Sequence, residues 1–227
     1  MLQIPTPKLS ESVHFYQQLG YEIIENADKT YASNGQLLIE INPHRHARAG
    51  IKLYQESWAT EIGALSKLAT LHPIKDGHLL SDSNGVWIYL MNGNSPIDFI
   101  KRAESIGITG NYAGISIEST ELTKSLKIYE AIGFVKEKGD AAHGWLSLKH
   151  NSGLEISIMK ALMCPHLFFN PSLSFFNGKE GNPICLDAIY ASGIPIAEEV
   201  SHFNKEGKVD NLILRDPGGL GFFVFND

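Results

Sequence analysis

The sequence predicts an α+β protein made of two tandem domains, and three features lead to this expectation. Residues 12–21 and 125–134 share serine, tyrosine, glycine and a closing aromatic at matching positions, 113 residues apart. An Asp-x-x-Gly turn recurs at 82–85 and 216–219, 134 residues apart. Apolar residues alternate along segments such as 36–42 in the manner of β-strands. A repeat at about half the chain length indicates two copies of one domain.

Each copy is expected to begin with a strand and a short helix. Phe15 and Leu19 lie four residues apart on one helical face, and Ile128 and Ile132 repeat this spacing in the second copy. A glycine follows each of these helices directly, at the position where helices commonly end in a left-handed turn. An aromatic residue and further strand-like segments come next. The repeating unit is therefore a strand, a helix and a run of strands.

A second helix is expected inside each copy, ahead of the repeated Asp-x-x-Gly turn. One should span about residues 58–71, and the other 183–190, with Asn182 before it and proline at its first position. These helices divide the chain into four units. Residues 96–108 are expected to form a helical connector. The first domain is expected at 1–95, with units 2–42 and 47–92, and the second at 109–227, with units 112–160 and 166–227.

The composition restricts the classes of function. Of the 227 residues, 43% are hydrophobic and 10% aromatic, which is enough apolar surface to form a folded core. The net charge of −6 argues against a nucleic-acid partner, and no apolar run approaches the ~20 residues that span a bilayer. The first residues lack the pattern of a signal peptide, and Cys164 and Cys185 are too few for a disulfide framework. We therefore expect a cytoplasmic protein without membrane or nucleic-acid partners.

The order of these segments resembles the vicinal oxygen chelate superfamily, which includes glyoxalase I, bleomycin-resistance proteins, fosfomycin-resistance enzymes and extradiol dioxygenases. The resemblance depends on Ser-x-x-Phe-Tyr-x-x-Leu-Gly-Tyr at 12–21, Ser-x-x-Ile-Tyr-x-x-Ile-Gly-Phe at 125–134 and Arg-Asp-Pro-Gly-Gly at 215–219. It implies four βαβββ units whose mixed sheets curl in pairs into cups, with helices on the outer face and a ligand or metal inside. In this fold the units pair within one chain or across a dimer, so a monomer and a homodimer both remain open.

Strand alternation assigns side chains to the two faces of each sheet. The aliphatic row that contains Ile88 and Leu90 should meet the helices, and the residues between should face the first cup. After the last turn, Phe222 should face outward and its neighbours inward. The side chains expected to line the two cups and bind a ligand are Arg48, Lys52, Tyr54, Trp87, Tyr89, Tyr112, Ser157 and Phe223.

The resemblance also implies where a metal would be held. Family enzymes commonly bind a divalent metal through His, Glu or Gln near the start of each opening strand and four residues after the turn glycine of each closing strand. The opening positions of this chain hold Met1 or its neighbour, Arg48, Tyr112 and Ser172, and the closing positions hold Ile39, Tyr89, Ser157 and Phe223. Most of these side chains are poor ligands for such metals. We therefore expect no metal, no other cofactor and no catalytic residue.

These features predict a metal-free protein of the bleomycin-resistance type that binds a small molecule. Trp87, Tyr89 and Tyr54 would hold a planar ligand in the first cup, and Arg48 or Lys52 would meet its anionic or polar group. The second cup is expected to be more apolar, with Phe176, Phe223, Phe225 and Met159 in its lining.

Two alternatives remain open at this point. Glu40 lies one residue beyond the expected metal position, and with His44 or His46 it would suit a divalent-metal-dependent lyase or dioxygenase. The aromatic side chains of the cups could instead be packed core in a scaffold whose sheet mediates dimerisation and that binds no ligand. Cys164 and His166 lie close in sequence, but a buried structural thiol is the expected role of this cysteine.

Overall fold

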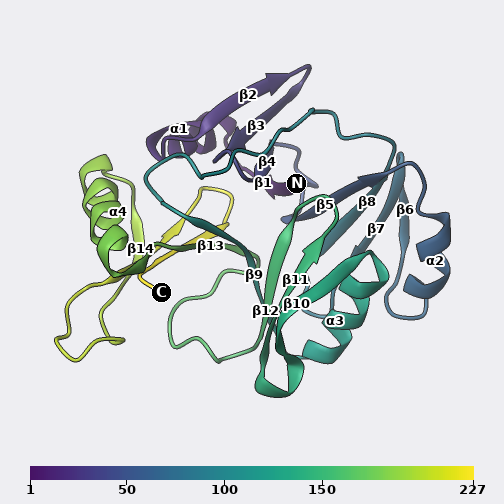
Figure 1. Ribbon diagram of the computed structural model, residues 1–227. Helices are drawn as coiled ribbons and strands as arrows, with labels where there is room; N and C mark the ends of the chain where they lie inside the picture. The colour runs from purple at the N-terminus through teal and green to yellow at the C-terminus, as the bar shows by residue number, and fades with distance from the viewer.

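The computed structural model describes residues 1–227 and consists of two eight-stranded mixed sheets (Figure 1). The first sheet runs from edge to edge as β2 (Glu22–Asn26), β3 (Lys29–Ser33), β4 (Leu38–Asn42), β1 (Leu2–Pro5), β5 (Gly50–Gln55), β8 (Trp87–Asn92), β7 (Gly77–Ser81) and β6 (His72–Ile74). The second runs as β10 (Phe134–Asp140), β11 (Trp145–His150), β12 (Glu155–Lys160), β9 (Tyr112–Ser119), β13 (Ser172–Phe176), β16 (Gly221–Phe225), β15 (Asn211–Arg215) and β14 (Ile196–Val200). The two orders match position by position, which confirms the α+β class and the two tandem domains.

The two units of each domain join along their opening strands. In the first sheet β1 pairs in parallel with β4 and in antiparallel with β5, and in the second sheet β9 makes the same pairings with β12 and β13. The two units of each sheet therefore pair within one chain. We call the face of each sheet that the helices leave free its cup.

The repeated helices bury equivalent positions. They are α1 (Leu9–Gln18) and α3 (Leu122–Ala131), and each ends before a glycine with positive φ, +77° at Gly20 and +95° at Gly133. That left-handed conformation is the reason for glycine at both positions. The side chains that the two helices bury are Ser12, Phe15 and Tyr16 in the first and Ser125, Ile128 and Tyr129 in the second.

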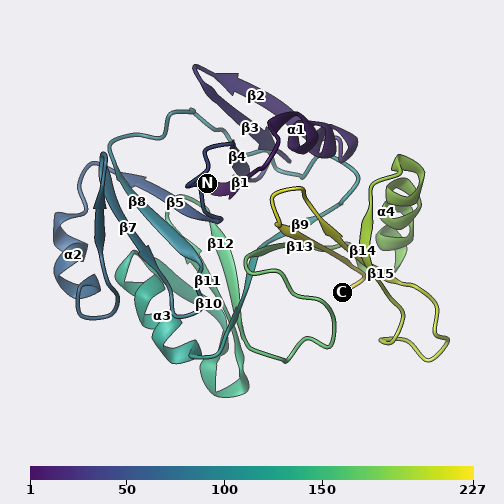
Figure 2. The same cartoon turned by 180° about the vertical axis from the view of Figure 1, so that it is seen from behind.

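The helices pack in pairs that join the two domains. α1 lies beside α4 (Gly178–Ser192) on one side of the molecule, and α2 (Ala59–Leu65) lies beside α3 on the other (Figures 1 and 2). The ring of Phe15 meets the ring of Phe222 edge-on at 5.5 Å. A core of 39 buried residues takes side chains from both domains, so the two sheets share one interior. None of the four helices is long and apolar enough to cross a membrane.

On β8 and β16 the strand faces follow the predicted alternation. Ile88 and Leu90 belong to the shared core, whereas Tyr89 between them lies on the cup face of β8 beside Lys52. Phe222 also belongs to that core, and its neighbour Phe223 belongs to a separate cluster. That second cluster fills part of the second cup and consists of Val200, Ile213, Phe223 and Phe225.

Residues 96–108 are not helical, contrary to the prediction. Three of their backbone N–H groups donate to carbonyl oxygens of the first domain, among them Ile108 N–H to Leu19 O at 2.9 Å. Gly107, with φ at +96°, passes so close that a Cβ there would overlap the same Leu19 carbonyl oxygen. The segment is extended along the first domain because its hydrogen bonds go there and not along a helix of its own.

The inner helices also begin and end at other residues than predicted. α2 ends at Leu65, because the next residues tighten into turns in which Leu68 N–H donates to Leu65 O. α4 begins at Gly178, ahead of Pro183, and is longer than the predicted helix. Asn182 is buried inside α4, where its Nδ2 donates to Asp210 O at 2.6 Å, and so it packs against the domain and does not cap the helix.

Candidate ligand-binding site

A buried ion pair occupies the centre of the first cup. Glu40 on β4 is only 2% exposed, and Lys52 Nζ from β5 lies 2.7 Å from its Oε2 atom. Lys29 Nζ lies 3.6 Å from Oε1 of the same carboxylate. Lys52 Nζ is also 5.3 Å from the ring centroid of Tyr89, within the range of a cation–π contact. Burial lowers the pKa of Lys52, and the negative charge of Glu40 opposes this shift.

Glu40, and not Ile39, faces the first cup, which corrects the predicted position. Ser33 pairs with Leu38 across the first hairpin, so two residues separate Gly35 from the closing strand. In the other three hairpins with a turn glycine, only one residue lies between that glycine and the closing strand. The extra residue shifts the strand by one position, and this shift reverses the face of every side chain. Ile39 consequently lies in the shared core.

The donors near the first cup do not fit the divalent metal that the fold family commonly holds. The Glu40 carboxylate is already paired with the Lys52 ammonium. His44 and His46 are exposed on the loop after β4, where their rings lie 5.4 Å apart and Arg45 Nε donates to His46 Nε2. Nowhere does the chain bring together three His, Cys, Asp or Glu side chains that could hold a metal ion. The ligand set considered for a lyase or dioxygenase is therefore not assembled.

The second cup has hydroxyl groups and phenyl rings at its base. The hydroxyl oxygens of Ser116 and Ser174 lie 2.6 Å apart, and Ser157 and Phe223 occupy the neighbouring positions of the same face. Such groups are not a usual ligand set for a divalent metal. A cavity of about 260 Å³ lies above them. Its aromatic walls are Trp145, Phe168, Phe176, Phe223 and Phe225.

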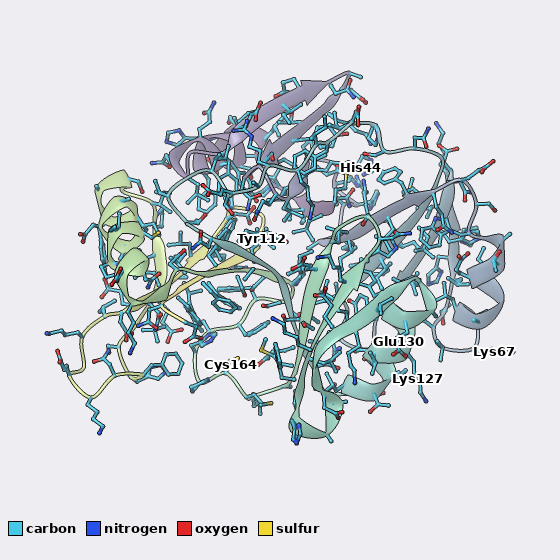
Figure 3. The ribbon with its side chains drawn as sticks, in the orientation of Figure 1. His44, Lys67, Tyr112, Lys127, Glu130 and Cys164 are labelled. Carbon is cyan, nitrogen blue, oxygen red and sulfur yellow. The ribbon has the colours of Figure 1, made fainter.

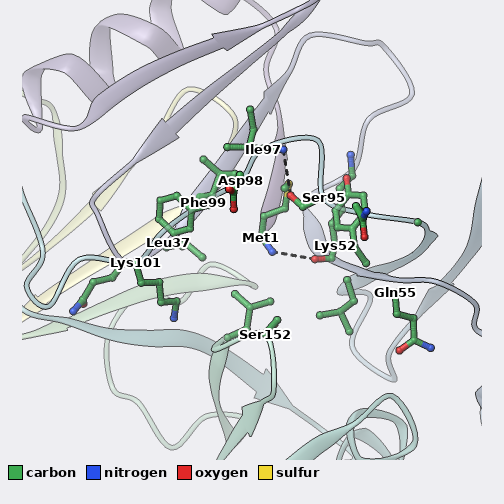
Figure 4. A pocket seen from close by; sticks show the side chains of 17 residues that line it. Met1, Leu37, Lys52, Gln55, Ser95, Ile97, Asp98, Phe99, Lys101 and Ser152 are labelled. Carbon is green, nitrogen blue, oxygen red and sulfur yellow. Dashed lines mark hydrogen bonds between the residues drawn. The ribbon is translucent and has the colours of Figure 1, made fainter.

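A larger cavity, of about 320 Å³, lies at the rim of the first cup between the two domains (Figure 4). Lys52 and Tyr54 reach it from β5, and Ser152 reaches it from the β11–β12 turn of the second domain. Residues 93–101 cover one side of it. We call it the rim cavity. Its apolar lining comes from Met1, Leu37, Leu38, Leu53, Ile97, Phe99 and Leu154, and its charged lining from Lys52, Asp98 and Lys101.

Two lysines give the rim cavity its positive charge, and only one of them has a carboxylate partner. Figure 4 shows Lys101 and Lys52 on either side of Met1. Lys52 is paired with Glu40, whereas Lys101 takes part in none of the salt bridges of the chain and donates to the carbonyl oxygen of Gly153. Partial burial lowers the pKa of Lys101. Lys101 is therefore the cation of this cavity that a ligand could neutralise.

The eight predicted site residues do not converge on one cavity. Lys52 and Tyr54 line the rim cavity, and Phe223 lines the second cup. Tyr89 is buried beneath Lys52. Neither of the remaining two residues of the predicted first-cup set lines the rim cavity: the Arg48 guanidinium donates to Ala47 O at 2.8 Å, and Trp87 lines a separate cavity beside α3.

Tyr112 does not line the second cup. Its ring packs at 5.8 Å from the ring of Phe175, which lies in the shared core (Figure 3 labels Tyr112). β13 pairs Ser174 with Gly114 but Phe175 with Tyr112, so β9 carries one extra residue at this point. This β-bulge reverses the face of the residues before it. The sequence carries no clear signal for it.

Sequence reasoning missed the contribution of the segment between the domains. Asp98, Phe99 and Lys101 line the rim cavity, yet all three fall within the predicted helical connector. The cavity forms only where this segment, the first cup and the second domain meet. A pattern within one unit could not have indicated it.

Several solved structures align with nearly the whole chain. The chain aligns over 98% of its length with the homoprotocatechuate 2,3-dioxygenase from Arthrobacter globiformis and covers 77% of that chain, with 14% identity and a TM-score of 0.58. The Mn(II)-bound glyoxalase from Novosphingobium aromaticivorans aligns with 98% of this chain over 79% of its own length, with 14% identity and a TM-score of 0.56. The 2,2',3-trihydroxybiphenyl 1,2-dioxygenase from Sphingomonas wittichii aligns with 100% of this chain over 90% of its own length, with 15% identity and a TM-score of 0.53.

At these identities the likeness concerns the fold. No protein-family model matches the sequence, and no match was found among curated proteins. The solved structures nevertheless share the arrangement over nearly the whole chain, and glyoxalase and extradiol dioxygenases are both among them. The two matched sheets and their four repeated units therefore give this chain the fold of the vicinal oxygen chelate superfamily.

Proposed function

We propose that the protein binds a small, planar organic monoanion in the rim cavity without the help of a metal ion. The observation that carries this proposal is the meeting of Lys101, which has no carboxylate partner, with the rings of Phe99 and Tyr54 in one cavity. An aromatic carboxylate combines the two properties that such a lining recognises, because its ring packs on apolar walls and its charge meets an ammonium group.

The charges of the cavity favour a single negative charge on the ligand. Lys52 is balanced by Glu40, so its ammonium attracts a second anion less strongly than Lys101 does. Asp98 adds a carboxylate to the lining and would repel a dianion. An anionic ligand would also restore the stabilisation that Lys101 loses through partial burial.

The volume limits the size of the ligand. At about 320 Å³ the cavity lies near the small end of the ~300–1,000 Å³ that is typical of ligand pockets. It suits a molecule of one or two rings. The rim cavity supports this function better than the second cup does, because the lining of the second cup has no lysine or arginine.

The test is a titration with planar monocarboxylates such as benzoate and naphthoate, followed by calorimetry and thermal denaturation. The neutral amides of the same rings are the ligand control. We expect Lys101→Met to weaken carboxylate binding at least ~10-fold and to leave amide binding unchanged. Phe99→Ala should weaken the binding of both.

Two further variants separate this cavity from other sites. Lys136→Met removes an exposed lysine of β10, and Phe223→Leu changes the second cup. Both are expected to bind the carboxylates like the unchanged protein. Equal affinity in Lys101→Met, or a loss in Phe223→Leu as large as that in Lys101→Met, would contradict the proposal.

A divalent-metal-dependent lyase or dioxygenase is the second candidate, and it is supported by the fold and by the inward position of Glu40. Elemental analysis of protein purified without a histidine tag distinguishes the two. Stoichiometric zinc, nickel, manganese or iron that is lost in Glu40→Gln would favour the enzyme and overturn the metal-free proposal.

A further inference from the structure

The mouth of the second cup brings sulfur and imidazole groups together. The Cys164 thiol donates to the thioether sulfur of Met159 at 3.1 Å. Met159 belongs to the inward row of β12, and Cys164 lies on the loop that follows β12 (Figure 3). His166 and Met163, from the same loop, line the same cavity of about 260 Å³. None of the four residues lines the rim cavity.

We propose that Met159, Cys164 and His166, with Met163 beside them, form a binding site for a soft monovalent metal ion of the copper(I) class. Thiolate and thioether sulfur are the ligands that select copper(I), and imidazole also binds copper well. The site is separate from the hydroxyl groups of Ser116 and Ser174 at the base of the cup.

The sulfur pair is already close to the separation that one ion requires. Two sulfur ligands held at ~2.3 Å from one metal lie about 3.8 Å apart, so the pair would open by less than ~1 Å. On binding, the ion takes the place of the proton between the two sulfur atoms. The Cys164 thiol loses that proton to solvent, and a sulfur–copper bond replaces the sulfur–hydrogen bond without change of oxidation state.

The hydrogen bond of His166 is compatible with the same site. Its Nδ1 lies 2.8 Å from the carbonyl oxygen of Leu167, and because a carbonyl oxygen can only accept, Nδ1 carries the proton. The Nε2 lone pair is thereby left free to bind. A metal-binding histidine commonly has this arrangement, with its other ring nitrogen donating to a backbone carbonyl group.

The surroundings favour a low charge. The His166 ring centroid lies 5.1 Å from the ring centroids of Phe223 and of Phe225, and Phe168 packs against the same ring. Apolar walls disfavour a net charge. One thiolate with one monovalent ion is neutral, whereas the same thiolate with a divalent ion keeps a positive charge. Asp227 also lines the cavity, so the preference for copper(I) over zinc(II) depends mainly on the thioether sulfur ligands.

The test is an anaerobic titration of copper(I) in competition with bicinchoninate, read from the absorbance of the chelator complex. We expect one ion per chain, at least ~100-fold weaker binding in Cys164→Ser, and at least ~10-fold weaker binding in Met159→Leu. Cys185→Ser is the matched control, because Cys185 lies on α4 against the shared core. Native mass spectrometry with silver(I) gives a second measurement that does not depend on copper redox chemistry.

Each outcome decides the proposal. Binding that persists in Cys164→Ser, an equal loss in Cys185→Ser, or no copper retained against the chelator would overturn it. If Cys164→Ser does not fold, Met159→Leu and His166→Ala carry the test, and unchanged affinity in both would count against the site. Because the rim cavity shares no residue with this cluster, carboxylate binding should be the same in all these variants, and the two proposals fail separately.

Discussion

The Tyr16 hydroxyl of the first domain donates a hydrogen bond to Oδ2 of Asp216 in the second, at 3.0 Å. The mirror contact joins Tyr129 of the second domain to Asp82 of the first, at 3.3 Å. The repeated tyrosine and the repeated Asp-x-x-Gly turn are therefore partners across the domain interface. Each aspartate also accepts from a backbone N–H of its own turn through Oδ1. Both halves of the sequence repeat thus contribute to the contact between the domains.

Removing one of these hydroxyl groups should destabilise the whole protein. In Tyr16→Phe, the buried Oδ2 atom of Asp216 loses its side-chain donor, and a buried acceptor without a donor costs ~1–3 kcal/mol. Tyr190→Phe is the control, because the Tyr190 hydroxyl bonds to Glu199 at the surface and should contribute less than ~0.5 kcal/mol. Urea denaturation gives both values. Equal effects of the two changes would contradict a special role for the interface contact.

The same aspartate should make stability depend on pH. Burial raises the pKa of Asp216 from its ordinary 3.8 to about 6. Between these values the folded protein holds a proton that the unfolded chain has released, so stability decreases as the pH rises from about 4 to about 6. The total loss from this group is up to ~3 kcal/mol.

Asp216→Asn imitates the protonated side chain, so its unfolding free energy should fall less between pH 4 and pH 7 than that of the unchanged protein. Asp82, whose pKa burial also raises, is present in both proteins and contributes equally to each. Urea denaturation at several pH values gives the two slopes. If the slopes coincide, Asp216 ionises as freely in the folded protein as in the unfolded chain.

The fold and the strand faces could be predicted because one face of each sheet is buried. Ile88 and Leu90, and later Phe222, form an apolar row that only one register places against the helices. The repeated glycines after α1 and α3 could be predicted for a similar reason, since a left-handed helix end favours glycine.

The site could be predicted only in part, because it depends on small irregularities and on contacts between domains. One extra residue after Gly35 places Glu40 on the face of the first cup, and one β-bulge turns Tyr112 away from the second cup. Lys101 reaches the rim cavity from a segment whose hydrogen bonds to the first domain override its helical pattern. Of the predicted first-cup residues, Lys52 and Tyr54 line that cavity because they follow the regular alternation of β5.

Replacing only Lys52 of the ion pair in the first cup should destabilise the protein more than replacing both Lys52 and Glu40. Lys52→Met leaves Glu40 buried with only Lys29 at 3.6 Å, and an uncompensated buried charge costs ~3–5 kcal/mol. The double variant Lys52→Met with Glu40→Gln removes both charges and should recover much of that loss. Lys8→Met, which breaks the exposed pair with Glu11, should change stability by less than ~1 kcal/mol. A double variant as unstable as the single one would show that the pair stabilises the cup by more than charge balance.

Two glycines of the first domain should respond to alanine with opposite signs. Gly50 on β5 lies opposite Trp87 on β8, and a Cβ there would overlap the Trp87 carbonyl oxygen, so the central strands must separate. We expect Gly50→Ala to destabilise the protein by ~2–4 kcal/mol. Gly63 lies inside α2 with open space around the position of a Cβ, and Gly63→Ala should stabilise by ~0.5–1 kcal/mol through helix propensity. Thermal denaturation measures both changes. A neutral Gly50→Ala would mean that β5 and β8 can move apart freely, and the Lys52 ammonium would then not be held in place over the Tyr89 ring.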